Sequence, residues 1–374
     1  MVNFKIERSF IVCFLNIILL YGISVRIPIL ISICSILLYS IVFLQITKPD
    51  RSFLFRSKLP KAFVAVYLLF MVYLLSSLLM SSGSNVLFWS FRNSIYFLFV
   101  ITPLTFFNVI TLKKYGLKKY LRSLFHAVFL MSIIVGTIYF QNYIAADRYQ
   151  QVGNLAAFCL VLSFLHFKEE KLLSLLGLVT SLYILLFSGS RQAIVASLIV
   201  IIFIILYNFI LTNNKKSGRL KFLLFFMLFL PIYWWIYSLD FTMSNSFPTI
   251  ARMIKLFETI ESNSRVVIWT KFLDKVELYP QFYNFSIGQD PTELAHNFFI
   301  EYMLCTGLIF GIFFILTIFR ILIKGLKNVH ELVFISLIFF ISFNVSSGLS
   351  SAKYFIVFLL TISLFIKDQE IRLK

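Results

Sequence analysis

The chain has 374 residues, of which 60% are hydrophobic and 13% are charged. Soluble globular proteins carry about 25% charged residues, so this composition excludes a soluble domain, a disordered chain and a small disulfide-rich scaffold. The formal net charge of +18 would suggest nucleic-acid binding in a soluble protein, but a membrane protein can carry such an excess in its loops.

Apolar segments long enough to cross a bilayer recur along the whole chain. A helix needs about 20 mostly apolar residues to span the hydrocarbon core, and segments of that kind predict about 12 membrane spans. They cover residues 9–25, 27–46, 62–81, 93–112, 123–145, 151–167, 172–190, 192–212, 222–239, 297–319, 329–345 and 352–366. The last two are among the shortest and have Glu331 and Lys353 near their ends, so the number of spans is about 11 or 12. The sequence therefore predicts an all-α, polytopic integral membrane protein.

The basic residues divide according to the side of the predicted bundle. Cytoplasmic loops of membrane proteins carry an excess of Lys and Arg. With a cytoplasmic N-terminus, most of the 34 Lys and Arg residues fall in loops on that side. This topology explains the basic excess, places both termini in the cytoplasm, and predicts the lipid bilayer rather than nucleic acid as a partner.

One polar stretch, residues 240–296, interrupts the pattern of short loops between the ninth and tenth spans. It lies on the side opposite the termini. Apolar residues recur in it at helical spacing, including Trp269 and Phe272, which predicts amphipathic helices on the bilayer surface or over the bundle. Long loops are usually functional. The predicted organisation is spans 1–9 (residues 1–239), the large loop, and spans 10–12 with a cytoplasmic C-terminus (residues 297–374).

Three side chains on the outer side are the candidates for catalysis. His296 is the only histidine predicted there, and an imidazole, with an unperturbed pKa of about 6.5, can act as a general base. Arg191 follows Ser-Gly-Ser at the start of a span, and Arg265 follows Asn-Ser in the large loop. Arginine binds phosphate through paired hydrogen bonds, and a helix start offers backbone N–H groups to an anion. Lipid-headgroup anchoring or structural ion pairs would explain the same residues without catalysis.

Four further residues are candidates for substrate binding. Ser190 precedes Arg191, and Arg148 is another outer arginine. Asn297 and Glu301 are four residues apart at the start of the tenth span, so a helix would place them on one face, and an acid within a span is a functional candidate. The sequence has no Gly-rich phosphate loop, no His-Glu-x-x-His and no Cys/His cluster, so it predicts neither a metal site nor a cofactor.

Three segments in this order resemble the bacterial family of O-antigen polymerases and O-antigen ligases. They are residues 188–191 (Ser-Gly-Ser-Arg), 263–265 (Asn-Ser-Arg), and 295–301 (Ala-His-Asn-Phe-Phe-Ile-Glu) leading to 307–311 (Gly-Leu-Ile-Phe-Gly). The multi-span layout with one large loop near the C-terminus is also similar. Gly307 and Gly311 would let the tenth span pack closely against a neighbour.

The resemblance implies metal-independent glycosyl transfer at the periplasmic face of the inner membrane, with a glycan on undecaprenyl pyrophosphate as donor. His296 would take the proton of the acceptor hydroxyl, while Arg191 and Arg265 would hold the leaving pyrophosphate. In a polymerase the acceptor is a second lipid-linked repeat unit, and in a ligase it is the lipid A core. We favour the polymerase, because the large loop shows no evident docking surface for a bulky core. A chain-length regulator is then a further candidate partner.

Two other classes stay open at this point. A lipid-linked glycan flippase or another transporter would explain the spans and an anion site at the two arginines, but it gives His296 no task. Transporters also usually carry charged residues near the midplane of their spans, and no predicted span has one there. A peptidoglycan polymerase would use similar donors, but the acidic residue expected in its large outer loop has no clear counterpart.

Overall fold

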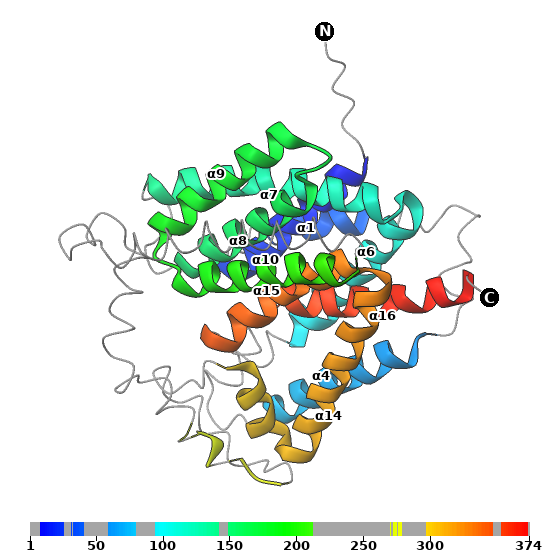
Figure 1. The fold of residues 1–374 in the computed structure, drawn as a ribbon. Coiled ribbons are helices and arrows are strands. Elements are labelled where there is room, and N and C mark those ends of the chain that lie inside the picture. Colours follow the sequence, from blue (N-terminus) through cyan, green and yellow to red (C-terminus); the bar gives the residue numbers. More distant parts are fainter. Residues whose placement is uncertain are drawn as a thin grey trace, which may run out of the picture. The chain divides into compact units, whose positions relative to one another are not determined.

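The computed structural model describes residues 8–25, 31, 33–40, 59–79, 94–141, 149–211, 270, 272–274, 276–278, 297–346 and 353–372. Within these ranges the chain is helical, without a β-strand (Figure 1). The helices are α1 (Arg8–Val25), α4 (Lys61–Leu79), the π-helical turn η2 (Phe97–Ile101), α6 (Thr102–Tyr115), α7 (Leu117–Phe140), α8 (Tyr149–His166), α9 (Lys171–Ser188), α10 (Arg191–Leu211), α14 (Phe298–Asn328), α15 (His330–Ser346) and α16 (Lys353–Arg372). The predicted all-α class is confirmed for this part of the chain.

Five helices of the described part are long and apolar enough to cross a membrane. They are Ser94–Tyr115, Leu117–Phe140, Lys171–Ser188, Arg191–Phe209 and Phe298–Asn328. Shorter apolar helices cover Ser9–Gly22, Lys61–Ser76, His330–Ser342 and Lys353–Ile366. The span predicted at 222–239 lies outside the described residues, and so does much of the one at 27–46. The total of about 12 spans therefore stays a prediction.

The chain forms two compact units. The first unit comprises Met1–Ala127 and Ser264–Lys374, and the second comprises Val128–Asn263. In the second unit α8 is the central helix, because it packs against both α9 and α10. Its side chains are buried without interruption from Val152 to Ser163. Small residues on such a helix let neighbouring backbones approach closely.

In the first unit α14 packs against α4, α15 and α16, and aromatic rings fill much of the contact. Phe314 is fully buried and lies at the centre of this cluster. Its ring stacks on Tyr302 at 4.0 Å between centroids and meets Phe70 edge-on at 5.3 Å. Phe298 and Phe299 each lie 6.3 Å from it. Ring pairs of this geometry add about 0.5–1.5 kcal/mol each beyond the apolar area that they bury.

The helix α14 is interrupted at Gly307, which has φ 81° and ψ 165°. This backbone region is essentially restricted to glycine. Just after the break, the amides of Leu308 and Ile309 donate to the carbonyl oxygens of Glu277 and Leu278, at 2.9 Å and 3.4 Å. The N–H groups at the start of a helix have no partner within that helix. A segment of the large loop therefore supplies the acceptors that the broken helix lacks.

This break corrects the sequence prediction for the tenth span. We predicted one continuous helix over 297–319, with Gly307 and Gly311 packing against a neighbour. The structure instead has a short helix before Gly307, and residues 308–328 after it measure about 31 Å, which is enough to cross the hydrocarbon core. At Gly311 an added Cβ would overlap the Met303 side chain of the short helix. Gly311 thus leaves room for the Met303 side chain of the same helix.

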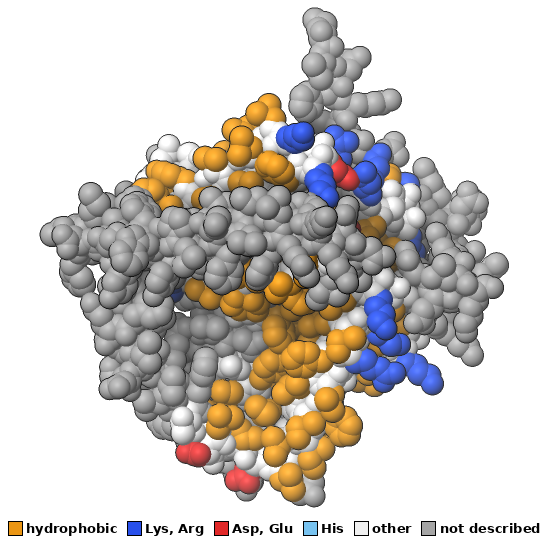
Figure 2. All heavy atoms as spheres, viewed as in Figure 1, with side chains coloured by type: hydrophobic (Ala, Val, Ile, Leu, Met, Phe, Trp, Pro, Cys, Tyr) orange, Lys and Arg blue, Asp and Glu red, His pale blue; other side chains and the backbone are white. Residues whose placement is uncertain are grey.

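The surface of α14 beyond the break is apolar along its flank. Phe313 and Leu316 are 59% and 60% exposed. In Figure 2 this apolar surface has Lys and Arg side chains toward one end and Asp and Glu side chains at the opposite end. The basic residues of α14 all belong to its C-terminal part: Arg320, Lys324 and Lys327. An apolar flank followed by a basic end suits a helix that lies in lipid with that end in water.

We expect Gly307→Ala to lower the free energy of unfolding by about 1–3 kcal/mol, because a side chain is strained at this backbone conformation. Gly116→Ala is the matched control. Gly116 has φ 81° and ψ 159° at the end of α6, and an added Cβ there meets nothing within 4 Å, so a side chain there carries a similar backbone strain on another helix. Thermal unfolding in detergent compares the two stabilities.

Hydrogen exchange then distinguishes the effect of backbone strain, which both variants share, from the effect of losing the helix break at Gly307. Peptides covering residues 272–278 and 308–309 should exchange faster in Gly307→Ala and stay unchanged in Gly116→Ala. Equal exchange in the two variants would contradict a role of the break in holding the large loop.

Candidate functional site

The turn between α9 and α10 holds two of the predicted site residues, Ser190 and Arg191. Gly189 follows the last residue of α9 with φ 81° and ψ 7°, a left-handed conformation that commonly ends a helix. The N–H of Ser190 donates to Ser188 Oγ at 3.4 Å, and the Tyr139 hydroxyl donates to the Ser188 carbonyl at 3.3 Å. The Ser-Gly-Ser sequence thus ends one helix and fixes the start of the next.

The start of α10 is rich in hydrogen-bond donors. Within the described part of the chain, Ser190 Oγ is fully buried without a hydrogen-bond partner, and so is Nε2 of Gln192. The Gln192 residue as a whole is 6% exposed, and Arg191, between the two, is half-buried. The N–H of Arg191 donates to the Gly189 carbonyl at 3.2 Å, so the backbone contributes here mainly through the positive end of the helix dipole. A hydroxyl, an amide and a guanidinium at one helix start can bind an anion with several acceptor oxygens, such as phosphate.

The helix α8 closes this turn from one side through Gly153. A Cβ added at Gly153 would overlap the Cβ of Ser190 and lie 2.5 Å from its Oγ. Asn154, the next residue, is buried. The first turns of α8 and α10 therefore meet at Ser190, and only glycine leaves room for it. Sequence reasoning missed Gly153, because a single glycine in an apolar helix gives no indication of which residue approaches it.

The short helix before Gly307 carries two other predicted residues, Asn297 and Glu301. The Asn297 side chain accepts hydrogen bonds from the N–H groups of Phe299 and Ile300, at 3.0 Å and 3.2 Å. The N–H of Glu301 donates to the Asn297 carbonyl at 3.0 Å. Asn297 is extended, with φ −141° and ψ 118°, so the predicted shared helix face with Glu301 is wrong: Asn297 caps the helix instead of belonging to it.

The carboxyl group of Glu301 accepts a hydrogen bond from the Tyr73 hydroxyl of α4. The Tyr73 ring stacks on Tyr302 with centroids 5.8 Å apart and an interplanar angle of 15°. The Tyr302 hydroxyl in turn donates to the Leu69 carbonyl of α4 at 2.9 Å. Two tyrosines therefore join α4 to the short helix, and one of them contacts the half-buried Glu301. Tyr73 was not predicted, because a tyrosine inside an apolar span carries no functional signal by itself.

The large loop contacts the same short helix through Phe272. Phe272 is buried against Ile300, and Met303 and Leu304 pack around the pair. Leu273, the next residue, is exposed. Together with the hydrogen bonds at the break, this contact docks the described part of the loop onto the short helix.

The predicted site residues thus fall into three groups. Ser190 and Arg191 start α10 in the second unit. Asn297 and Glu301 start the short helix in the first unit. The remaining predicted residues lie outside the described residues: Arg148, Arg265 and His296. Among the residues that the structure describes, no group of three or more His, Cys, Asp or Glu side chains could hold a metal ion.

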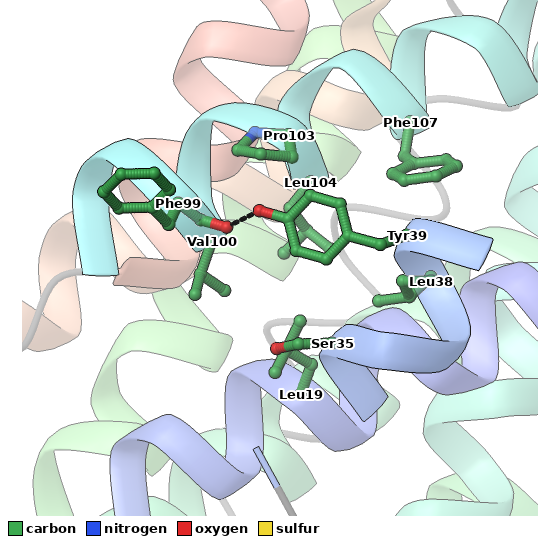
Figure 3. Close-up of a pocket in the computed structure, with 9 residues that line it drawn as sticks. All are labelled: Leu19, Ser35, Leu38, Tyr39, Phe99, Val100, Pro103, Leu104 and Phe107. Atoms are coloured by element: carbon green, nitrogen blue, oxygen red, sulfur yellow. Dashed lines mark hydrogen bonds between the residues drawn. The ribbon is translucent and has the colours of Figure 1, made fainter. Parts of the chain in front are cut away.

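A small apolar pocket occurs elsewhere in the first unit (Figure 3). It is lined by Leu19, Ser35, Leu38, Tyr39, Phe99, Val100, Pro103, Leu104 and Phe107. The Tyr39 hydroxyl donates to the Phe99 carbonyl, at the π-helical turn η2. The lining side chains are almost all hydrocarbon or aromatic, so this small pocket is a packing feature and not a site for chemistry at polar bonds.

Comparison of the chain with protein-family models, with curated proteins and with solved structures finds no match in any of the three.

We expect Gly153→Ala to reduce the free energy of unfolding by about 1–3 kcal/mol, because the added methyl group overlaps Ser190 next to the backbone of a tight turn. Gly136→Ala is the matched control in the same unit. Its Cβ would meet Ile184 Cδ1 at 2.8 Å, and the end of a flexible side chain can move away.

Chemical or thermal unfolding of the purified protein measures the difference between these variants. A Gly136→Ala variant as unstable as Gly153→Ala would show that contact with Ser190 is not what makes glycine necessary at position 153.

Proposed function

We propose that this protein is an O-antigen polymerase of a bacterial inner membrane, which joins undecaprenyl-pyrophosphate-linked repeat units at the periplasmic face by metal-independent glycosyl transfer. The observation that carries the proposal is the start of α10. There Arg191 lies between two buried side chains, Ser190 and Gln192, whose donor atoms have no partner in the described part of the chain. Pyrophosphate oxygens are acceptors for such donors.

The position of these donors at the end of an apolar helix supports a lipid-linked substrate. Arg191–Phe209 is among the helices that are apolar and long enough to cross a membrane. A headgroup bound at its first turn would leave the attached polyprenyl chain in the hydrocarbon region of the bilayer, where its apolar surface is not exposed to water. A soluble sugar nucleotide would gain no such benefit.

The proposed topology has about 12 spans, cytoplasmic termini and the large loop (240–296) in the periplasm. The basic C-terminal part of α14 supports it, because Arg320, Lys324 and Lys327 follow the apolar flank of the helix. With that end in the cytoplasm, the start of α14 and the docked loop segment face the periplasm.

In the proposed reaction the acceptor hydroxyl oxygen attacks the anomeric carbon of the donor, and the bond from that carbon to the pyrophosphate oxygen breaks. His296 takes the hydroxyl proton as general base. Arg191 and Arg265 stabilise the negative charge that the leaving pyrophosphate gains. Arg148, Asn297 and Glu301 are proposed to bind the substrates. The polypeptide then needs no metal, since arginines hold the pyrophosphate.

We expect Arg191→Ala, Arg265→Ala and His296→Ala each to reduce polymerisation by about 10²–10³-fold, because each removes an oriented partner of the transition state. Arg191→Lys should stay impaired, because an ammonium group lacks the planar paired donors of a guanidinium. Arg320→Ala is the matched control, because it removes the same charge from an exposed position in the C-terminal part of α14.

The measurement is complementation of a strain lacking this gene, with the surface polysaccharide resolved by gel at equal protein levels. A deletion strain whose lipid A core carries a single repeat unit, restored to long chains by wild type and Arg320→Ala only, would support the polymerase. Bare core with long lipid-linked polymer would favour the ligase. If the protein in proteoliposomes moves lipid-linked glycan across the membrane without changing the length of the glycan chain, a flippase is favoured.

A further inference from the structure

We infer that Tyr73 is a positioning residue, which holds the carboxyl group of Glu301 in the orientation needed to bind a hydroxyl group of the acceptor sugar. The inference rests on the proposed glycosyl transfer and adds to it a residue on a distant helix. Its basis is the hydrogen bond from the Tyr73 hydroxyl to Glu301, which joins two residues far apart in sequence.

The Tyr73 hydroxyl has a fixed position because its ring is buried and stacked on a second ring. Tyr73 is buried, with 5% of its surface exposed, and its ring stacks on Tyr302. Tyr302 is in turn stacked on Phe314, with an interplanar angle of 7°. A donor at the end of a rigid, packed ring directs a carboxyl group more strictly than a flexible side chain or a water molecule would.

The backbone that carries Glu301 is fixed as well. Asn297 caps the short helix at one end, and the break at Gly307 ends it at the other. Phe272 of the large loop packs against Ile300, the residue before Glu301. The carboxyl group is therefore held from its own backbone and from α4, which is the arrangement expected of a side chain that must meet a substrate in one geometry.

The carboxyl group of Glu301 can accept more than one hydrogen bond. Its two oxygens offer about four acceptor positions, so a bond from Tyr73 is compatible with a further bond from a sugar hydroxyl. A carboxyl group in apolar surroundings is costly unless it is hydrogen-bonded. Pairing with Tyr73 lowers this cost in the protein without substrate and keeps the group half-buried at the start of the helix that follows His296 in the sequence.

The experiment compares Tyr73→Phe, Glu301→Gln, the double variant and Tyr302→Phe in the purified protein with lipid-linked repeat units. Tyr302→Phe is the matched control, because it removes a hydroxyl from the neighbouring ring that bonds to the Leu69 carbonyl instead of Glu301. Tyr73→Phe should lower kcat/KM for the acceptor by roughly tenfold to a hundredfold, the usual effect of losing a hydrogen bond to an ionisable group. The double variant should be no slower than Glu301→Gln, and Tyr302→Phe should stay within about twofold of wild type.

Infrared difference spectroscopy of the carboxyl band, assigned by its absence in Glu301→Gln, tests the same contact without any turnover. The band should shift in Tyr73→Phe and stay in place in Tyr302→Phe. If it does not shift in Tyr73→Phe, or if the losses of the two single variants multiply in the double variant, the inference is wrong. If wild-type protein transfers no glycan, the proposed function fails, and the infrared comparison still decides whether Tyr73 orients Glu301.

Discussion

The arrangement of the first unit depends on one requirement: backbone N–H groups in apolar surroundings need acceptors. The break at Gly307 exposes such groups at Leu308 and Ile309, and the carbonyl oxygens of Glu277 and Leu278 accept their hydrogen bonds. The break and the docked loop segment are therefore interdependent. Without the loop carbonyls the break would leave donors unpaired, and without the break those carbonyls would have no helix start to bind. The short helix ends at this break, and its Glu301 accepts a hydrogen bond from Tyr73 of α4.

The sequence predicts the helices well where apolar length is the decisive signal. The spans predicted at 172–190 and 192–212 correspond to Lys171–Ser188 and Arg191–Leu211, because a polar Ser-Gly-Ser turn separates two uniformly apolar runs. The tenth span was predicted less well. A glycine four residues from another is compatible both with close helix packing and with a helix break, and composition is the same in the two cases. The choice depends on whether a distant segment supplies acceptors, which the local sequence does not contain.

The residues of the candidate site also differ in whether the local sequence indicates them. The position of Ser190 and Arg191 at the start of a helix was predictable, because a donor-rich helix start is a local pattern. Tyr73 and Gly153 were not, because their importance comes from contacts across the fold: Tyr73 with Glu301, and Gly153 with Ser190. A local pattern identifies a residue by its neighbours in the chain, whereas a residue that is important through a contact across the fold is, in sequence, an ordinary member of its helix.

The two groups of site residues differ in how their polar atoms are satisfied. In the first unit, Asn297 caps a helix and Glu301 is bonded by a tyrosine, so the structure orders these groups by itself. In the second unit, Ser190 Oγ and Gln192 Nε2 are buried without partners among the described residues, at a cost of about 1–3 kcal/mol each. A bound anion would recover that cost, and a ligand present at a hundred times its Kd would stabilise the folded state by about 2.7 kcal/mol. Phosphate oxygens could pair with buried donors that lack partners among the described residues, as a binding site for a phosphorylated headgroup requires, whereas donors already paired within the protein would gain less from such a ligand.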